Sequence, residues 1–331
     1  MAFATDERDG THARDGWRAD VLGATWQARD LDLPGGAVAT LVRDAAAPGR
    51  PGRPAVLYVH GFIDYFFQTH VADAFAARGY PFVALDLRGY GRSIGRGTGA
   101  PSRPDDDPNF VTDLAVYAQD LDAAVRALRA EGHEEVVVLG HSTGGLVASL
   151  WADARPGRVA ALVLDSPWFE LNRPWVFRGP VTWVVDVVGR VAPRLVVGHL
   201  DEHWARALHA STGGEWDFDL AWKPLEGFPV RAGFLRSVRR AHRRVARGLA
   251  VDCPVLVLAS ARSGPAAGWH EALLTTDSVL DVEHIVSRGA RLGDDVTVVR
   301  VEGGAHDLAL SPEPARSTYL REVLDWLDAR T

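Results

Sequence analysis

One stretch constrains the fold of this 331-residue chain more than any other: residues 135–147, EVVVLGHSTGGLV. It begins with an apolar run from Val136 to Leu139, and the residues after Gly144 have a composition that suits a helix. Gly140 and Gly144 stand two residues before and two residues after Ser142. In a sharp turn from strand into helix these two positions come close together, and only very small side chains fit there. The stretch therefore predicts a buried strand, a strained turn with a serine at its apex, and a helix.

The spacing is the GxSxG pattern of a nucleophilic serine. The turn exposes the hydroxyl of Ser142 and places the backbone N–H of Thr143 at the N-terminus of the following helix, where negative charge is stabilised. Glycine and serine are common residues, so the pattern alone is also compatible with an ordinary strand-to-helix turn. Its interpretation depends on the rest of the chain.

Short apolar runs alternate with helix-compatible segments along most of the chain. Runs buried on both faces and alternating with helices predict an α/β fold, with a mostly parallel sheet and helices on both faces. An antiparallel hairpin, residues 20–31 and 37–43, is expected at the start, around the turn signal Leu33-Pro34-Gly35-Gly36. The other expected strands are 55–59, 82–85, 136–139, 160–164, 254–258 and 296–301. The expected helices are 65–78, 112–130, 143–155, 233–249, 281–289 and 312–329, the last with Ser311 as its N-cap.

This alternation stops after Asp165. Residues 167–230 show no clear strand, so we expect an inserted helical cap there, with residues 16–166 and 231–331 forming the core. The aromatic residues of the cap are compatible with plain packing or with the lining of an apolar pocket. Six of the eleven tryptophans lie in it: Trp168, Trp175, Trp183, Trp204, Trp216 and Trp222.

The expected helix 233–249 is amphipathic. Its apolar stripe consists of Phe234, Val238, Ala241, Val245 and Leu249. Its arginines occupy the other positions, and in an acidic protein we expect them on a solvated face. They are Arg236, Arg239, Arg240, Arg243, Arg244 and Arg247.

Charge and composition narrow the class of protein. A formal net charge of −7 argues against a nucleic-acid partner. The first ten residues carry charge where a secretory signal needs an apolar core, and charged residues and a proline interrupt the apolar run 181–198, so we expect no integral membrane segment. Cys253 is the only cysteine, which excludes an internal disulfide and fits a reducing compartment. We therefore expect a cytoplasmic protein that acts on a small molecule.

A nucleophilic serine needs a base within hydrogen-bond distance and a carboxylate that orients the base. The carboxyl ends of parallel strands meet at one edge of a sheet, so these partners should follow other strands. His306 follows the last expected strand in a glycine-rich loop and is the predicted base. Asp277 is the predicted acid. Asp281 is the alternative, although it would serve equally well as the N-cap of the helix 281–289, and Asp165 ranks third.

Charge that develops on a substrate oxygen needs two hydrogen-bond donors. The backbone N–H of Thr143 is one. The second is expected from the loop His60-Gly61-Phe62 after the strand 55–59, and we assign it to the N–H of Phe62.

We expect neither a metal nor a cofactor. The segment from His199 to His203 matches the HxxEH pattern of zinc peptidases, but the sequence offers no obvious third ligand. Gly89, Gly91 and Gly95 follow a strand, yet their spacing departs from the dinucleotide-binding pattern.

Taken together, the motifs resemble those of the α/β-hydrolases, nearest to the serine-hydrolase branch with monoacylglycerol lipases, lysophospholipases and serine aminopeptidases. The resemblance implies the α/β-hydrolase sheet and a triad in the order Ser142, Asp277, His306. In one respect the chain departs from it: family members place the acid within a few residues of its strand, whereas residues 261–276 intervene here. The motifs are His60-Gly61-Phe62, the segment 86–93 (DLRGYGRS), the segment 140–145 (GHSTGG) and Gly304-Ala305-His306.

The expected function is the hydrolysis of carboxylic esters through an acyl-enzyme on Ser142, because an aromatic cap suits an apolar substrate group. A serine at this position argues against the haloalkane dehalogenases and epoxide hydrolases of the fold, which by resemblance carry aspartate there. An aminopeptidase, another amide or thioester hydrolase, and a non-catalytic binding protein remain alternatives. An aminopeptidase would need cap carboxylates to hold an ammonium group, and the candidates are Glu170, Asp186, Asp201, Glu202, Glu215, Asp217 and Asp219.

Overall fold

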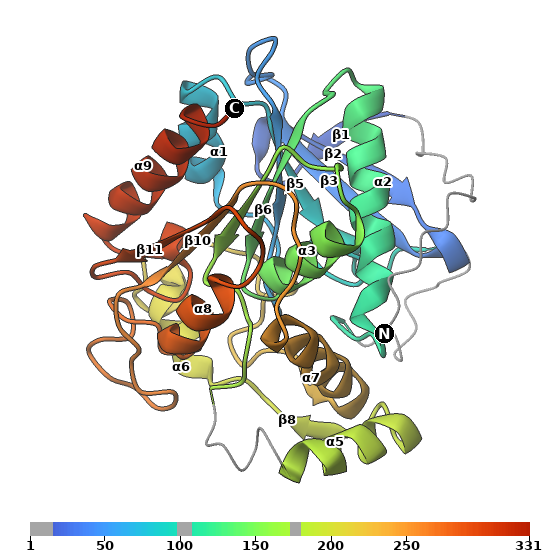
Figure 1. The fold of residues 1–331 in the computed structure, drawn as a ribbon, viewed down its shortest axis with the longest axis vertical. Coiled ribbons are helices and arrows are strands. Elements are labelled where there is room, and N and C mark those ends of the chain that lie inside the picture. Colours follow the sequence, from blue (N-terminus) through green and yellow to red (C-terminus); the bar gives the residue numbers. More distant parts are fainter. Residues whose placement is uncertain (1–15, 98–107, 173–179) are drawn as a thin grey trace.

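The computed structural model describes residues 16–97, 108–172 and 180–331, with no side-chain description for 180–183. A nine-stranded sheet runs through its centre in the order β1-β2-β3-β5-β4-β6-β7-β10-β11 (Figure 1). The six strands from β5 to β11 in this order are parallel, and β1 to β3 are antiparallel. The mostly parallel sheet is therefore confirmed. Its strands are β1 (Arg18–Asp20), β2 (Gly23–Asp32), β3 (Val38–Asp44), β4 (Ala55–Val59), β5 (Phe82–Asp86), β6 (Val136–His141), β7 (Ala161–Asp165), β10 (Val255–Ser260) and β11 (Val296–Val301).

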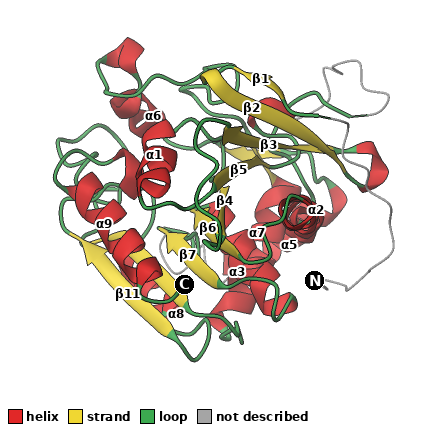
Figure 2. Ribbon diagram, turned by 90° about the horizontal axis from the view of Figure 1, so that it is seen from above, coloured by secondary structure: helices red, strands yellow, loops and turns green. Residues whose placement is uncertain are grey.

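Helices cover both faces of the sheet (Figure 2). Successive residues of a strand point to opposite faces. In β6, Val136 and Val138 accordingly join the core cluster with residues of α2, α3, α7 and α8, whereas Val137 and Leu139 join the cluster with α1 and α9. The helices are α1 (Thr69–Ala77), α2 (Tyr117–Ala130), α3 (Thr143–Ala154), α7 (Ala232–Ala246), α8 (Val282–Gly289) and α9 (Ala315–Asp328).

Residues 167–230, called here the inserted segment, lie between β7 and α7. Its described elements are α5 (Pro180–Val191), β8 (Val196–Gly198), the helix α6 (Glu202–Leu208), the 3-10 helix η4 (Ala210–Thr212) and β9 (Val230–Arg231), whose last residue directly precedes α7. The prediction that this segment contains no strand was wrong, because β8 and β9 pair as a small antiparallel sheet. Trp175 lies outside the described residues. In the part of the chain that is described, no helix has both the length and the apolarity needed to cross a membrane.

Three helix starts predicted from the sequence are wrong. The helix expected at 112–130 begins at Tyr117, after the short 3-10 helix Leu114–Val116. The helix expected at 65–78 begins at Thr69, because the backbone of the preceding residue, Gln68, is not helical (φ −76°, ψ 65°). The last helix begins at Ala315, and Ser311 is not its N-cap. Residues Leu308–Leu310 form a short 3-10 helix, η5, and the Ser311 hydroxyl accepts the backbone N–H of Ala305 at 2.9 Å. Ser311 thus braces the loop that carries His306.

The expected solvated face of α7 is also wrong at one position. Arg239 is 3% exposed and contacts the carboxylate of Glu170, which Arg288 of α8 approaches from the other side. Buried arginines of this kind require a carboxylate partner, because an unpaired charge in the protein interior is unstable. Helical periodicity places Arg239 between the apolar stripe and the surface, and the distant Glu170 decides that it turns inward.

Candidate active site

The turn between β6 and α3 puts Ser142 at a strained apex. Its backbone has φ +51° and ψ −113°, and its carbonyl oxygen accepts the N–H groups of Leu146 (3.1 Å) and Trp168 (2.9 Å). A Cβ on Gly140 would lie 2.8 Å from Cα of Gly145, so the strand and the helix touch at this point. The geometry explains why small residues surround the serine.

Substituting Gly144 by alanine is expected to destabilise the fold. The new Cβ would lie 2.3 Å from the carbonyl oxygen of Val59 and 2.4 Å from that of His60, and backbone atoms in a central strand cannot retreat. We expect a loss of about 1–3 kcal/mol or more in the free energy of unfolding, measured by urea denaturation. Gly198→Ala in β8 is the control, because no described atom lies within 4 Å of the methyl group it adds, and it should change stability little. Equal stabilities of the two variants would contradict the close packing inferred for the turn.

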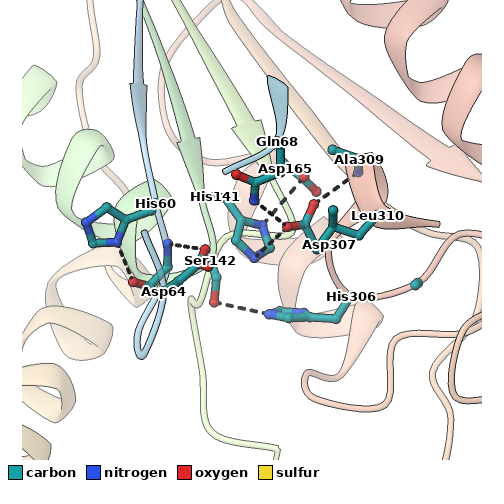
Figure 3. Close-up of polar contacts among 12 residues, drawn as sticks. His60, Asp64, Gln68, His141, Ser142, Asp165, His306, Asp307, Ala309 and Leu310 are labelled. Carbon is teal, nitrogen blue, oxygen red and sulfur yellow. Dashed lines mark hydrogen bonds and ion pairs between the residues drawn. The ribbon is translucent and has the colours of Figure 1, made fainter. Parts of the chain in front are cut away.

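His306 links Ser142 to Asp277. Its Nε2 lies 3.1 Å from the Ser142 hydroxyl oxygen, and its Nδ1 lies 3.1 Å from each carboxylate oxygen of Asp277 (Figure 3 shows the Ser142–His306 contact). The exposed fractions are 8% for Ser142, 4% for His306 and 0% for Asp277. At these distances the imidazole can take a proton from the hydroxyl while the carboxylate holds the other ring nitrogen. The structure thus brings these three residues together.

Asp277 reaches the end of β10 although a long segment separates it from the strand. The backbone closes on itself there, because Asp277 N–H donates to the Arg262 carbonyl at 2.9 Å and Gly264 N–H donates to the Asp277 carbonyl at 2.8 Å. Residues 265–276 therefore form a loop whose two ends are hydrogen-bonded together. The Asp277 carboxylate also accepts the N–H groups of Val279 (3.0 Å) and Leu280 (2.7 Å), which fix its orientation toward His306.

The other acids considered from the sequence have different partners. Asp281 caps α8 by accepting the N–H of Glu283 at 3.0 Å, and its carboxylate lies 3.5 Å from the ring of His284. Asp165 ends β7, where its carbonyl accepts the N–H of Ser142 at 2.9 Å and its carboxylate lies 3.5 Å from His141. Among these three carboxylates, all within the described residues, Asp277 is the one that hydrogen-bonds His306.

The loop after β4 lies directly beside the serine. A Cβ on Gly61 would be 3.2 Å from Cβ of Ser142, so the backbone that leads into Phe62 faces the nucleophile. Gly61 is held on both sides. His60 accepts the N–H of Leu87 on Nε2, which leaves the proton on Nδ1 to donate to the Gly61 carbonyl at 2.8 Å, and Gly61 N–H donates to Asp64 at 3.3 Å. Thr143, the residue after Ser142, is the first residue of α3.

A buried charge cluster behind the serine was missed in the sequence. His141 lies between Asp165 (3.5 Å) and Asp307 (4.0 Å), and Lys223 of the inserted segment binds Asp64 at 2.5 Å. Burial alone would lower the pKa of His141, but Asp307, Asp165 and Asp64 raise it to about 9, so the ring is cationic at neutral pH. One signal was present: Lys223 is the only lysine in the chain.

This cluster includes a candidate donor set for a metal, since ligand atoms of Asp64, His141 and Asp307 lie within 4.8 Å of one another. Hydrogen-bond donors of neighbouring side chains already use the oxygen atoms that a metal ion would need. The ammonium of Lys223 already lies on Asp64, and the Gln68 amide donates to Asp307 at 3.2 Å. A metal ion needs free lone pairs and a deprotonated imidazole, whereas here the positive charge is carried by the protein itself.

The HxxEH segment does not form the helical pair of a zinc peptidase. The helix α6 begins at Glu202 with Asp201 as its N-cap, so His199 precedes the helix and cannot share a face with His203. The ring of His203 instead contacts the Asp201 carboxylate at 2.7 Å.

Aromatic side chains from several elements adjoin the site. The Phe62 ring stacks on Phe234 of α7 with centroids 4.5 Å apart, and Trp204 of α6 meets the His306 ring edge to face at 6.1 Å. Trp168 is joined to the site by its backbone bond to Ser142. Apolar surface from the core and the inserted segment therefore borders the reacting groups.

Comparison with known proteins relates the chain to a peptidase family and to a lipase. A family model described as serine aminopeptidase, S33 (Hydrolase_4) matches residues 50–263. The chain is also similar to a monoacylglycerol lipase of Mycolicibacterium smegmatis, with 30% identity over 164 residues. The matched region is 49% of this chain and 54% of that lipase, so the chain spans about half the length of this relative.

Two solved structures share the fold. The monoacylglycerol lipase of Paleococcus ferrophilus has a TM-score of 0.62 and 20% identity, over 85% of this chain and 97% of that one. A soluble variant of monoglyceride lipase from Saccharomyces cerevisiae, in complex with a substrate analog, has a TM-score of 0.65 and 15% identity over 98% of each chain. At these identities the likeness concerns the fold, and the predicted fold class is confirmed.

Proposed function

We propose that this chain, which belongs to the serine aminopeptidase S33 family of α/β-hydrolases, cleaves carboxylic esters through an acyl-enzyme on Ser142. The observation that carries the proposal is the position of the His306 ring, 3.1 Å from the Ser142 hydroxyl and 3.1 Å from the Asp277 carboxylate. A serine hydroxyl is a weak nucleophile at neutral pH, and an oriented imidazole is what activates it.

In the proposed mechanism the Ser142 oxygen attacks the ester carbonyl while Nε2 of His306 takes the hydroxyl proton. Asp277 keeps the ring oriented and stabilises the imidazolium. The imidazolium then gives this proton to the departing alcohol, which leaves the acyl group on Ser142. In the second half water adds to the acyl carbonyl as His306 takes its proton, and the carboxylic acid departs as Ser142 recovers a proton from His306.

The negative charge on the substrate oxygen is assigned to two backbone donors, the N–H groups of Phe62 and Thr143. Support comes from the position of the Gly61 backbone against Ser142 and from the start of α3 at Thr143. Loss of one such donor typically costs about 3 kcal/mol in the transition state. Because both are backbone groups, side-chain changes at these positions test the shape of the site and leave the donors in place.

Esters are favoured over aminoacyl substrates because the carboxylates that could hold an ammonium group have other partners. Glu170 binds Arg239 and Arg288 in the interior. The remaining candidates are engaged as follows: Asp186 with Arg236, Asp201 as the cap of α6, Glu202 with Arg206, Glu215 with Arg316, Asp217 near His209, and Asp219 with the N–H of Ala221. Each of these contacts already offsets part of the carboxylate charge, so an incoming ammonium would gain less there than beside an unpaired carboxylate.

An apolar substrate group fits the aromatic surroundings. Trp204 meets His306 edge to face, and Phe62, which follows the Gly61 backbone beside Ser142, stacks on Phe234, so aromatic rings from the inserted segment and from the core are available to an acyl or alcohol chain. The inserted segment supplies Trp204, and we propose that it acts as a cap over the site. The similarity to a monoacylglycerol lipase supports the same substrate class.

The proposal is tested with two aryl esters that differ by one amine: the p-nitrophenyl esters of leucine and of 4-methylpentanoic acid. They have the same carbon skeleton and leaving group. We expect kcat/KM to be at least about 10-fold higher for the amine-free ester, because an unpaired ammonium loses hydration on entering an apolar site. The spontaneous hydrolysis rate of each ester is subtracted as the control. A preference for the leucine ester would favour the aminopeptidase alternative.

A further inference from the structure

The only lysine of the chain lies in the interior, on the inserted segment. Lys223 is 7% exposed, and its ammonium binds Asp64 at 2.5 Å. It also lies over the rings of Phe67 (5.1 Å) and Phe218 (5.3 Å). Lysine is the most strongly hydrated of the basic side chains, so its burial here requires these partners.

The backbone next to Lys223 is fixed to the same loop. The N–H of Lys223 donates to the Asp219 carbonyl at 2.9 Å, and the N–H of Asp219 donates to the Tyr65 hydroxyl at 2.7 Å. Trp222 meets the Tyr65 ring edge to face at 5.1 Å. Residues 218–223 are therefore seated on the chain that follows β4, by contacts at both ends.

Asp64 connects Lys223 to the backbone beside the nucleophile, because its carboxylate contacts both. One carboxylate oxygen receives Lys223, and the other accepts the N–H of Gly61 at 3.3 Å. Gly61 immediately precedes Phe62, whose N–H is the assigned oxyanion donor. Burial on its own would raise the pKa of Asp64, but Lys223, with His60 and His141, lowers it, so the carboxylate remains ionised and able to accept.

We propose that Lys223 is a positioning residue: through Asp64 and Gly61 it fixes the backbone that presents the Phe62 N–H to the developing oxyanion. The inference rests on the proposed function, because it concerns the same reaction. It implies that the oxyanion site is complete only while residues 218–223 are seated. The inserted segment then contributes to the rate of the chemical step as well as to substrate contact.

The kinetic test replaces Lys223 by methionine, which keeps the length and the apolar stem but removes the charge. We expect kcat for a p-nitrophenyl ester to fall by about 10- to 100-fold with KM nearly unchanged, because a misplaced donor weakens transition-state binding more than ground-state binding. Arg206→Met is the matched control. Arg206 is a cation of the same inserted segment whose ion pairs with Glu202 and Glu226 lie at the surface, so this variant should keep the parental kcat.

A double variant separates this role from simple loss of the fold. Lys223→Met leaves Asp64 buried without its ammonium, whereas Asp64→Asn combined with Lys223→Met leaves a neutral amide oxygen that still accepts the Gly61 N–H. We therefore expect the double variant to recover several-fold in kcat over Lys223→Met. Parental kcat in Lys223→Met, a change in KM alone, or a double variant no better than the single one would each overturn the inference.

A second readout does not depend on turnover. Because the chain has one lysine, reductive methylation followed by peptide mass analysis reports on Lys223 alone, apart from the terminal amine. We expect slow methylation in the parent and at least about 10-fold faster methylation in Asp64→Asn, where the ammonium has lost its anion. Methylation of the parent as fast as that of a free peptide amine would overturn the inference. Absence of ester hydrolysis in the parent would instead refute the proposed function.

Discussion

Replacing Ser142 by alanine is expected to lower kcat for ester hydrolysis by about 10⁴- to 10⁶-fold and to abolish labelling by a fluorophosphonate probe. The His306 imidazole would remain beside Asp277 but would have no hydroxyl to activate. The measurement is ester turnover together with peptide mass analysis of the probe adduct. Ser149→Ala is the matched control, because Ser149 lies two turns into the helix that follows Ser142 and its hydroxyl donates to the Gly145 carbonyl at 2.7 Å.

The outcome separates an enzyme from a hydrolase-like binding protein. Label on Ser142 in the folded parent, retained in Ser149→Ala, would support an activated serine. A parent that resists the probe while it keeps its thermal transition would count against the catalytic proposal, whatever the distances in the site. Residual hydrolysis in Ser142→Ala above the solvent rate is compatible with the proposal, because oxyanion donors alone retain some catalysis.

Replacing Asp277 by asparagine is expected to lower kcat by about 10⁴-fold with little loss of stability. The asparagine oxygen can still accept the N–H groups of Val279 and Leu280, but its amide would donate to Nδ1 of His306. The ring would then carry its proton on Nε2, which faces Ser142 and could no longer accept the hydroxyl proton. Turnover of an aryl ester at neutral pH measures the effect.

Asp281→Asn supplies the matched comparison. Asparagine caps helices about as well as aspartate, and the Asp281 carboxylate serves as the cap of α8, so kcat should stay within a few-fold of the parent. If the two variants exchanged these effects, the acid of the triad would be Asp281 and the hydrogen bonds between Asp277 and His306 would have no catalytic role. Equal and small effects would show that the orientation of His306 does not limit the reaction.

Much of this site could be predicted from the sequence because its constraints are local. The spacing of Gly140, Ser142 and Gly144 follows from steric crowding within five residues of chain. Apolar runs buried on both faces identify the parallel strands, and His306 could be assigned because it follows the last of them. Asp277 could be favoured because it lies before a helix, whereas Asp281 occupies a position where a cap is needed.

The features that escaped prediction depend on partners far away in the chain. Arg239 was expected on the solvated face but turns inward because of Glu170, and Lys223 is buried because of Asp64, 159 positions earlier. Ser311 is a residue type that often caps helices, but its hydroxyl instead accepts the backbone N–H of Ala305. Helical periodicity and capping preferences depend only on residues nearby in sequence. They therefore cannot predict an interaction with a charge or an N–H group that a distant element supplies.

The loop 265–276 is closed by hydrogen bonds just before Asp277, so the position of the Asp277 carboxylate depends little on the number of residues in the loop. Two backbone hydrogen bonds at 2.9 and 2.8 Å join its ends, so the position of the carboxylate depends first on these two bonds and less on the exposed residues between them. Evolution can therefore vary the exposed tip of this loop, residues 265–267, more freely than Leu273 and Thr276, which are buried. For a protein engineer this exposed tip is an insertion site, where a peptide tag or a binding module could be added a short distance from the catalytic groups.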